Sequence, residues 1–189
     1  MATRILTLYS TTIGKKAVMA VSGLVLIGFL IGHLSGNLLV FSEHGHQAIN
    51  DYSHWLREFG HGVVIWIVRA GLLAAALAHI WSAMSLTAHN RAARPVRYQR
   101  KQDLAATLSS KTMAYGGIAL FLYFIYHLAH LTFGVTVPAT ADQLKLVTGE
   151  YTPLPEGVRL LIETDVYTSI VSSFQEPAIA GVYILAQIF

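Results

Sequence analysis

Three histidines lie inside long apolar stretches of the chain, where an ionisable side chain is expensive and usually marks a functional site. His33 lies in stretch 17–41, His79 in stretch 63–86 and His127 in stretch 112–135. A neutral imidazole nitrogen is a common ligand for transition metals. The chemistry that these residues offer is therefore metal ligation inside a membrane.

The amino-acid composition is that of a membrane protein. Hydrophobic residues make up 54% of the chain and charged residues only 12%, against about 25% charged residues in a typical soluble domain. The chain has no cysteine, which excludes thiolate-ligated iron–sulfur clusters, c-type haem attachment and a cysteine nucleophile within it. Because its basic residues gather in a few segments, we expect no nucleic-acid partner.

The hydrophobic pattern predicts an all-α fold, a polytopic transmembrane helix bundle forming a single membrane domain over 1–189. Each histidine-bearing stretch exceeds the roughly 20 residues that a helix needs to cross the hydrocarbon core of a bilayer. Residues 47–59 have the spacing of an amphipathic helix in the membrane interface, and 137–174 form a polar connection. A last apolar stretch begins at 178 and covers only about 18 Å as a helix, so we expect a truncated fourth span.

The distribution of lysine and arginine predicts the orientation of the bundle. Basic residues concentrate before the first span and between the second and third spans. Because short cytoplasmic loops are enriched in these residues, we place the N-terminus in the cytoplasm. The basic loop 91–111 is then the largest cytoplasmic segment, and we expect it to bind carboxylates of a soluble partner.

Depth along the predicted helices pairs two of the histidines. His33 lies about 24 Å and His127 about 22 Å from the inner edge of its span, whereas His79 lies only about 10 Å from the inner end of its own. Two imidazoles at one depth suit a six-coordinate haem iron. Zinc would require a third or fourth ligand, usually with a carboxylate, and the three stretches contain no acidic residue.

Two further residues and one structural alternative stay open. His130 lies one turn beyond His127 and competes with it as the ligand of the third span. Arg69 lies near the level of the His33–His127 pair, where it either provides a cation for a haem propionate or a quinone oxygen or extends to the membrane surface. A membrane histidine can also simply hydrogen-bond a neighbouring helix.

Four short motifs give the chain a resemblance to a known family. They are GHLSGN at 32–37, AHIWSA at 78–83, NRAARPVRY at 90–98 and YHL at 126–128. In their order and spacing they resemble the cytochrome b558-type membrane anchor of succinate:quinone oxidoreductase, a di-haem, five-helix family shared with bacterial fumarate reductases. The resemblance covers nearly the whole chain.

The resemblance implies ligands for two haem b groups. In that family the first and third helices ligate the distal haem, and the second and fourth helices ligate the proximal haem. His33 and His127 would therefore hold the distal haem and His79 one side of the proximal haem. The fourth-helix histidine and the fifth helix of the family are lacking. We therefore expect further sequence with a histidine soon after Phe189, or else a single haem or a proximal ligand from another subunit.

The resemblance also implies partners and an activity. It predicts a flavoprotein and an iron–sulfur subunit on the cytoplasmic face, menaquinone as the quinone, and the lipid of a bacterial cytoplasmic membrane. The expected activity is electron transfer to quinone within a succinate dehydrogenase complex, with succinate oxidised on another chain. The alternatives are the cytochrome b subunit of a hydrogenase or formate dehydrogenase and a histidine-based proton-translocating protein. Proton relays normally contain membrane carboxylates, which the three spans lack.

Overall fold

The computed structural model describes residues 10–93, 96, 106–137 and 156–188, and every regular element within them is a helix. The predicted all-α fold is therefore confirmed. Most of the basic loop predicted to dock a partner lies outside the described residues. The contacts divide the chain into two units, Met1–Leu38 with Trp55–Lys101 and Leu39–His54 with Gln102–Phe189. Each unit is described by itself.

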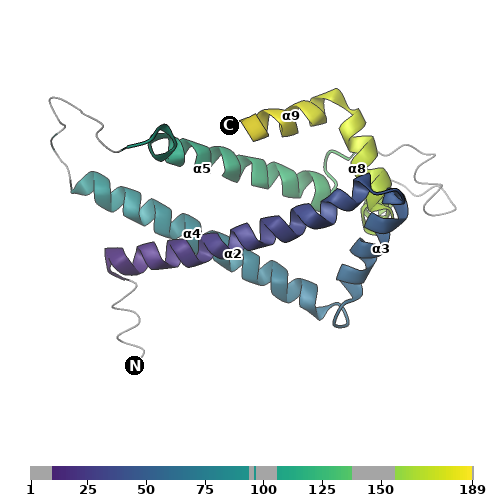
Figure 1. Ribbon diagram of the computed structural model, residues 1–189, viewed down its shortest axis with the longest axis horizontal. Helices are drawn as coiled ribbons and strands as arrows, with labels where there is room; N and C mark the ends of the chain where they lie inside the picture. The colour runs from purple at the N-terminus through teal and green to yellow at the C-terminus, as the bar shows by residue number, and fades with distance from the viewer. Residues whose placement is uncertain (1–9, 94–95, 97–105, 138–155, 189) are drawn as a thin grey trace. The chain divides into compact units, whose positions relative to one another are not determined.

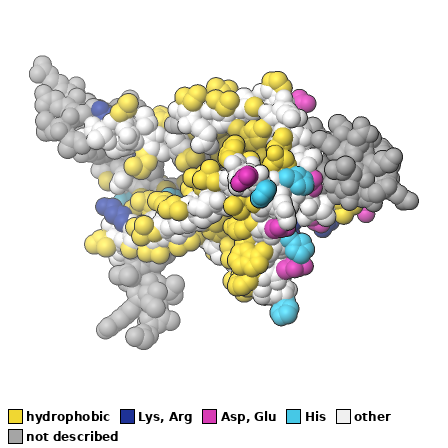
Figure 2. All heavy atoms as spheres, turned by 45° about the vertical axis from the view of Figure 1, so that its right-hand side comes forward, with side chains coloured by type: hydrophobic (Ala, Val, Ile, Leu, Met, Phe, Trp, Pro, Cys, Tyr) yellow, Lys and Arg dark blue, Asp and Glu magenta, His cyan; other side chains and the backbone are white. Residues whose placement is uncertain are grey.

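Three helices are long and apolar enough to cross a membrane. The first is α2 (Thr12–Asn37), continued by the 3₁₀ turn η1 (Leu38–Phe41), and the second is α4 (Val63–Ala92) (Figure 1). The third is α5 (Leu108–His127), continued by the π-helical turn η2 (Leu128–Thr132). Almost none of the residues in their most apolar parts is buried, and Figure 2 shows hydrophobic side chains over much of the surface that faces the viewer. Outward-facing apolar side chains are what a lipid environment requires.

Capping residues explain where two of these helices begin. The side chain of Thr11 accepts a hydrogen bond from the backbone N–H of Gly14 at 3.0 Å, which starts α2 five residues before the expected position. Thr107 caps α5 in the same way and accepts from the N–H of Ser110 at 3.3 Å. Gly134 follows the π-helical turn and has a φ of +68°. Glycine adopts positive φ without steric cost, which explains why a glycine is found at this position.

In the first unit, α2 and α4 pack against each other and run in opposite directions. Lys15 Nζ donates a hydrogen bond to Ser85 Oγ at 2.8 Å, and Ser22 Oγ lies 3.3 Å from His79 Nδ1. Residues early in α2 therefore meet residues late in α4. Ser22 and Ser82 are buried, and such small residues let two membrane helices approach closely.

The described residues of the second unit contain further α-helical segments besides α5. They are the start of α3 (Gly45–Glu58), α7 (Glu156–Thr164), α8 (Val166–Gln175) and α9 (Pro177–Ile188). Helix α8 contacts both α7 and α9, and α9 contacts α5. Helix α3 covers nearly the range predicted for an interfacial helix. Helix α7 and all but the last residue of α8 lie within the region expected only as a polar connection.

Candidate functional site

The imidazole of His79, on α4, is held by the backbone of α2. Its Nδ1 lies 3.1 Å from the carbonyl oxygen of Met19 and 3.3 Å from Ser22 Oγ. The ring is half-buried. The contact therefore comes from the packing of the two antiparallel helices, and it joins residues 60 positions apart in the sequence.

This arrangement determines which nitrogen of His79 carries the proton. A carbonyl oxygen only accepts hydrogen bonds, so the contact with Met19 places the proton of the neutral ring on Nδ1. Ser22 donates its own proton to the carbonyl of Val18 at 2.7 Å, which leaves its oxygen able to accept as well. The lone pair of His79 is then on Nε2. A metal-ligating histidine almost always donates its other ring N–H to a carbonyl, carboxylate or water.

Two small residues of the first unit, one on each of α2 and α4, bear on the site at His79. A Cβ added at Gly23 would lie 3.3 Å from Cε1 of His79, so the glycine is what allows the close approach of α2. Ser82, one turn further along α4, is fully buried, and its hydroxyl has no hydrogen-bond partner in the described part of the chain. Orphaned buried hydroxyls are uncommon in folded proteins.

His33 lies in the same unit, on α2. Its ring stacks on Phe29, with 5.2 Å between the ring centroids and 17° between the planes. A Cβ added at Gly28 or Gly32 would meet no atom within 4 Å, so open space lies beside α2 at these two glycines. The predicted partner of His33 in a haem site, His127, belongs to the second unit. Their pairing therefore stays a prediction.

The two histidines of the third apolar helix meet a tyrosine of α9. The hydroxyl of Tyr183 lies 2.9 Å from Nδ1 of His130 and 3.3 Å from Nδ1 of His127. His130 is fully buried, and its Nε2 has no hydrogen-bond partner within the described residues. The π-helical turn η2 begins directly after His127, and such turns are frequent at functional sites. Sequence reasoning missed Tyr183, because nothing local in α9 indicates the contact.

Arg69 is exposed on α4 and contacts a neighbouring aromatic ring. Its guanidinium carbon lies 5.0 Å from the centroid of the Trp66 ring, within the range of a cation–π interaction. Trp66 therefore constrains the guanidinium. The predicted role of Arg69 toward a propionate or a quinone stays a prediction.

A polar network in the second unit was also missed by the sequence analysis. The carboxylate of Asp165 accepts hydrogen bonds from Asn50 Nδ2 at 3.0 Å, from Thr168 N at 3.1 Å and from Thr168 Oγ1 at 2.6 Å. Asp165 caps the N-terminus of α8, and its Asn50 contact joins α8 to α3. The spacing of Asp165 and Thr168 is an N-cap signal readable from sequence. The tie to Asn50, 115 residues away, is not.

The protonation of Asp165 is controlled by these contacts. Burial by itself raises the pKa of the carboxyl, but hydrogen bonds from Thr168 and Asn50 and the charge of His46 outweigh burial and hold that pKa below its ordinary value. His46 Nε2 lies 3.4 Å from the carboxylate. The network therefore favours the charged form of Asp165.

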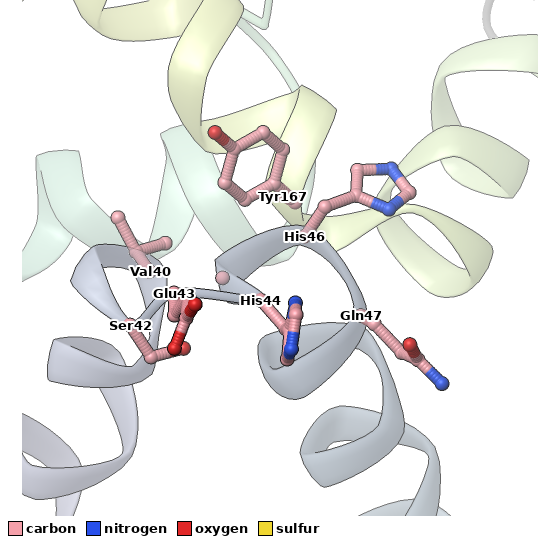
Figure 3. A pocket seen from close by; sticks show the side chains of 8 residues that line it. Val40, Ser42, Glu43, His44, His46, Gln47 and Tyr167 are labelled. Carbon is pink, nitrogen blue, oxygen red and sulfur yellow. The ribbon is translucent and has the colours of Figure 1, made fainter.

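A shallow, open hollow of about 360 Å³ lies beside this network. Figure 3 shows its lining, in which Tyr167 of α8 lies next to His46 of α3, and the other lining residues come from η1, the turn before α3 and the first turn of α3. The rings of Tyr167 and His46 meet edge to face at 5.1 Å. No buried polar atom of the lining lacks a hydrogen-bond partner, so we assign this hollow no ligand.

Among the described residues, no three or more histidine, aspartate or glutamate side chains form a group that could hold a metal ion by themselves. The predicted ligands His33, His79 and His127, with its competitor His130, therefore belong to no such group, and metal binding by them stays a prediction. Comparison of the chain with known protein families, with curated proteins and with solved structures finds no match.

Proposed function

We propose that this chain is a haem b-binding membrane anchor that passes electrons between an iron–sulfur subunit and membrane quinone, as in succinate:quinone oxidoreductase. The observation that carries the proposal is the 3.1 Å contact between His79 Nδ1 and the carbonyl oxygen of Met19. It directs the proton to Nδ1 and leaves the Nε2 lone pair for a metal. It does so on a helix that is long and apolar enough to cross a membrane.

The side chains fit a haem better than a bare metal ion. A six-coordinate haem needs only two axial ligands from the protein, because the macrocycle supplies the other four nitrogens. Single imidazoles on separate helices meet that need, whereas a bare ion needs a cluster that the described residues lack. His33 and His127 would hold a distal haem, with His130 as the competitor of His127. His79 would hold one side of a proximal haem.

When bound, haem iron supplies one-electron transfer. The residues of the chain determine how the iron is held. The carbonyl of Met19 orients the imidazole of His79 and makes its Nε2 more basic. A membrane around the three helices would restrict water and so influence the reduction potential. Arg69, whose guanidinium is exposed beside Trp66, would offer a positive charge to a propionate or to a quinone oxygen.

We also propose the setting of the chain. It would lie in a bacterial cytoplasmic membrane with its N-terminus inside, and it would use menaquinone. The iron–sulfur and flavoprotein subunits would dock on the cytoplasmic loop 91–111. The concentration of lysine and arginine in that loop and before the first span supports this orientation, and the resemblance of the four motifs supports the partners.

The test is a reduced-minus-oxidised optical spectrum of the full chain in its native membrane. Two haem b species are expected, of which His79→Ala removes one, while His33→Ala and His127→Ala each remove the other. His89→Ala is the matched control, since it removes an imidazole from the last turn of α4 and should leave both species. Absence of haem b from the unsubstituted protein would refute the proposal.

A second measurement separates the two dehydrogenase classes. Membranes that contain the chain should reduce quinone with succinate as the electron donor. The purified chain should also carry with it a flavin-containing subunit and an iron–sulfur subunit. Haem b without succinate-dependent quinone reduction would instead indicate the cytochrome b subunit of another dehydrogenase.

A further inference from the structure

The hydroxyl of Tyr183 lies between two imidazoles of the third apolar helix. It is 2.9 Å from Nδ1 of His130 and 3.3 Å from Nδ1 of His127. Tyr183 is 9% exposed and His130 is 0% exposed. Within the described residues, these two nitrogens are the hydrogen-bond partners of the hydroxyl. One phenol therefore serves two potential metal ligands.

Packing holds the ring of Tyr183 independently of these hydrogen bonds. Its centroid lies 4.8 Å from that of Phe174, 5.6 Å from that of Tyr123 and 5.7 Å from that of Tyr126. All three contacts are edge to face, an arrangement that the charge distribution of aromatic rings favours. The aromatic neighbours thus determine where the hydroxyl lies, and the imidazoles must adapt to it.

The single hydroxyl proton places the two histidines in opposite tautomers. A phenol donates one hydrogen bond and can also accept, so Tyr183 donates to one Nδ1 and accepts from the Nδ1–H of the other ring. O–H donors make shorter contacts than N–H donors. The 2.9 Å contact fits the hydroxyl proton better than the 3.3 Å contact does, so we assign that proton to the bond from Tyr183 to His130. His127 then donates its Nδ1–H to the Tyr183 oxygen and carries its lone pair on Nε2.

We infer that Tyr183 is a positioning residue that selects His127 over His130 as the haem ligand of the third apolar helix. This inference rests on the proposed haem function. The Tyr183 oxygen does for His127 what the carbonyl of Met19 does for His79: it orients the ring and makes Nε2 more basic. His130 keeps its proton on Nε2, which is buried, and therefore has no lone pair there for a metal.

Tyr183→Phe tests the inference, because it removes one oxygen atom and keeps the ring. Without the acceptor for its Nδ1–H, His127 is a less basic ligand and stabilises ferric iron less. The midpoint potential of the distal haem should therefore rise and that of the proximal haem should stay unchanged. A tenfold change in the ferric-to-ferrous preference corresponds to about 59 mV for one electron, which an optical redox titration resolves. Equal distal potentials in the unsubstituted protein and in Tyr183→Phe would overturn the inference.

Tyr126→Phe is the matched control for this measurement. It removes the same hydroxyl group from a tyrosine whose ring contacts Tyr183 edge to face, and it should leave both potentials unchanged. A rise in the distal potential equal to that of Tyr183→Phe would show that any lost tyrosine hydroxyl in this cluster has the effect, and would overturn the specific role of Tyr183.

A second variant tests the tautomer argument directly. His130→Ala removes the acceptor of the hydroxyl proton, which then competes for Nδ1 of His127 and opposes the ligating tautomer. The occupancy of the distal haem should fall, and it should recover when Tyr183→Phe is added. If His130 is itself the ligand, the distal haem is lost and the double variant does not recover it, which overturns the inference. Absence of haem from the unsubstituted protein would refute the proposed function instead.

Discussion

Replacing Asp165 with asparagine should loosen the contact between α3 and α8. The carboxylate accepts from Asn50 at 3.0 Å, from the backbone N–H of Thr168 at 3.1 Å and from the hydroxyl of Thr168 at 2.6 Å. Asparagine keeps one acceptor oxygen and caps helices as well as aspartate does. However, it places an NH₂ group where the second carboxylate oxygen meets the hydroxyl of Thr168.

The size of the effect follows from exchanging charged hydrogen bonds for neutral ones. A hydrogen bond to a charged group contributes about 1.5–3 kcal/mol and a neutral one about 0.5–1.5 kcal/mol. The two bonds that remain on one oxygen should each weaken by about 1 kcal/mol. The Thr168 hydroxyl can accept from the new NH₂ group, so the third charged bond becomes a neutral one, which costs about 1 kcal/mol more. The free energy of opening the start of α8 should therefore fall by about 3 kcal/mol, roughly a hundredfold in the opening equilibrium.

Native-state amide hydrogen exchange measures this opening directly, because protection reports local unfolding. Exchange in the first two turns of α8 should accelerate roughly a hundredfold in Asp165→Asn. Glu176→Gln is the matched control, since it makes the same chemical change on an exposed carboxylate after the last turn of α8, and it should exchange like the unsubstituted chain. An acceleration below about threefold in Asp165→Asn would refute the reasoning from these distances.

Acid should act on the unsubstituted chain as Asp165→Asn does. The depressed pKa of the Asp165 carboxyl contributes stability that is fully present above about pH 3.9 and is lost as the pH falls through the lower pKa of the folded state. Hydrogen exchange in α8 of the unsubstituted chain should therefore accelerate at low pH. Exchange in Asp165→Asn should not show this acceleration. Gly23→Val should displace the His79 ring, since an added Cβ lies 3.3 Å from its Cε1, and the haem spectrum should lose the proximal species. Gly28→Val, where an added Cβ meets no atom within 4 Å, should leave the spectrum unchanged. Gly134→Ala should cost about 1–3 kcal/mol, because φ is +68° and the new Cβ would lie 2.6 Å from a side-chain atom of α7; faster hydrogen exchange in α7 would show it.

The sequence predicted the histidines of the candidate site but not the residues that contact them. His33, His79 and His127 stand out because a polar group in an apolar helix is conspicuous in the linear pattern. What each ring can do depends on which of its nitrogens is protonated, and for His79 that depends on a carbonyl of α2. Tyr183 has no such local signal, and Asp165 has only that of a helix N-cap. One lies in an ordinary apolar segment and the other in a segment that reads as a polar connection.

The sequence by itself determined the helical, membrane-crossing character of the chain, since hydrophobic length and helix capping depend only on residues that are neighbours along the chain. Tertiary structure alone decided the contacts that give the histidines their chemistry. The partners of His79 and His130 lie 60 and 53 residues away, and the partner of Asp165 lies 115 residues away. Which of many polar atoms meets a given imidazole depends on how the helices pack and rotate against each other. The packing depends on how well whole helix faces fit together, and each face is formed by many residues along the helix, so no short stretch of sequence predicts it.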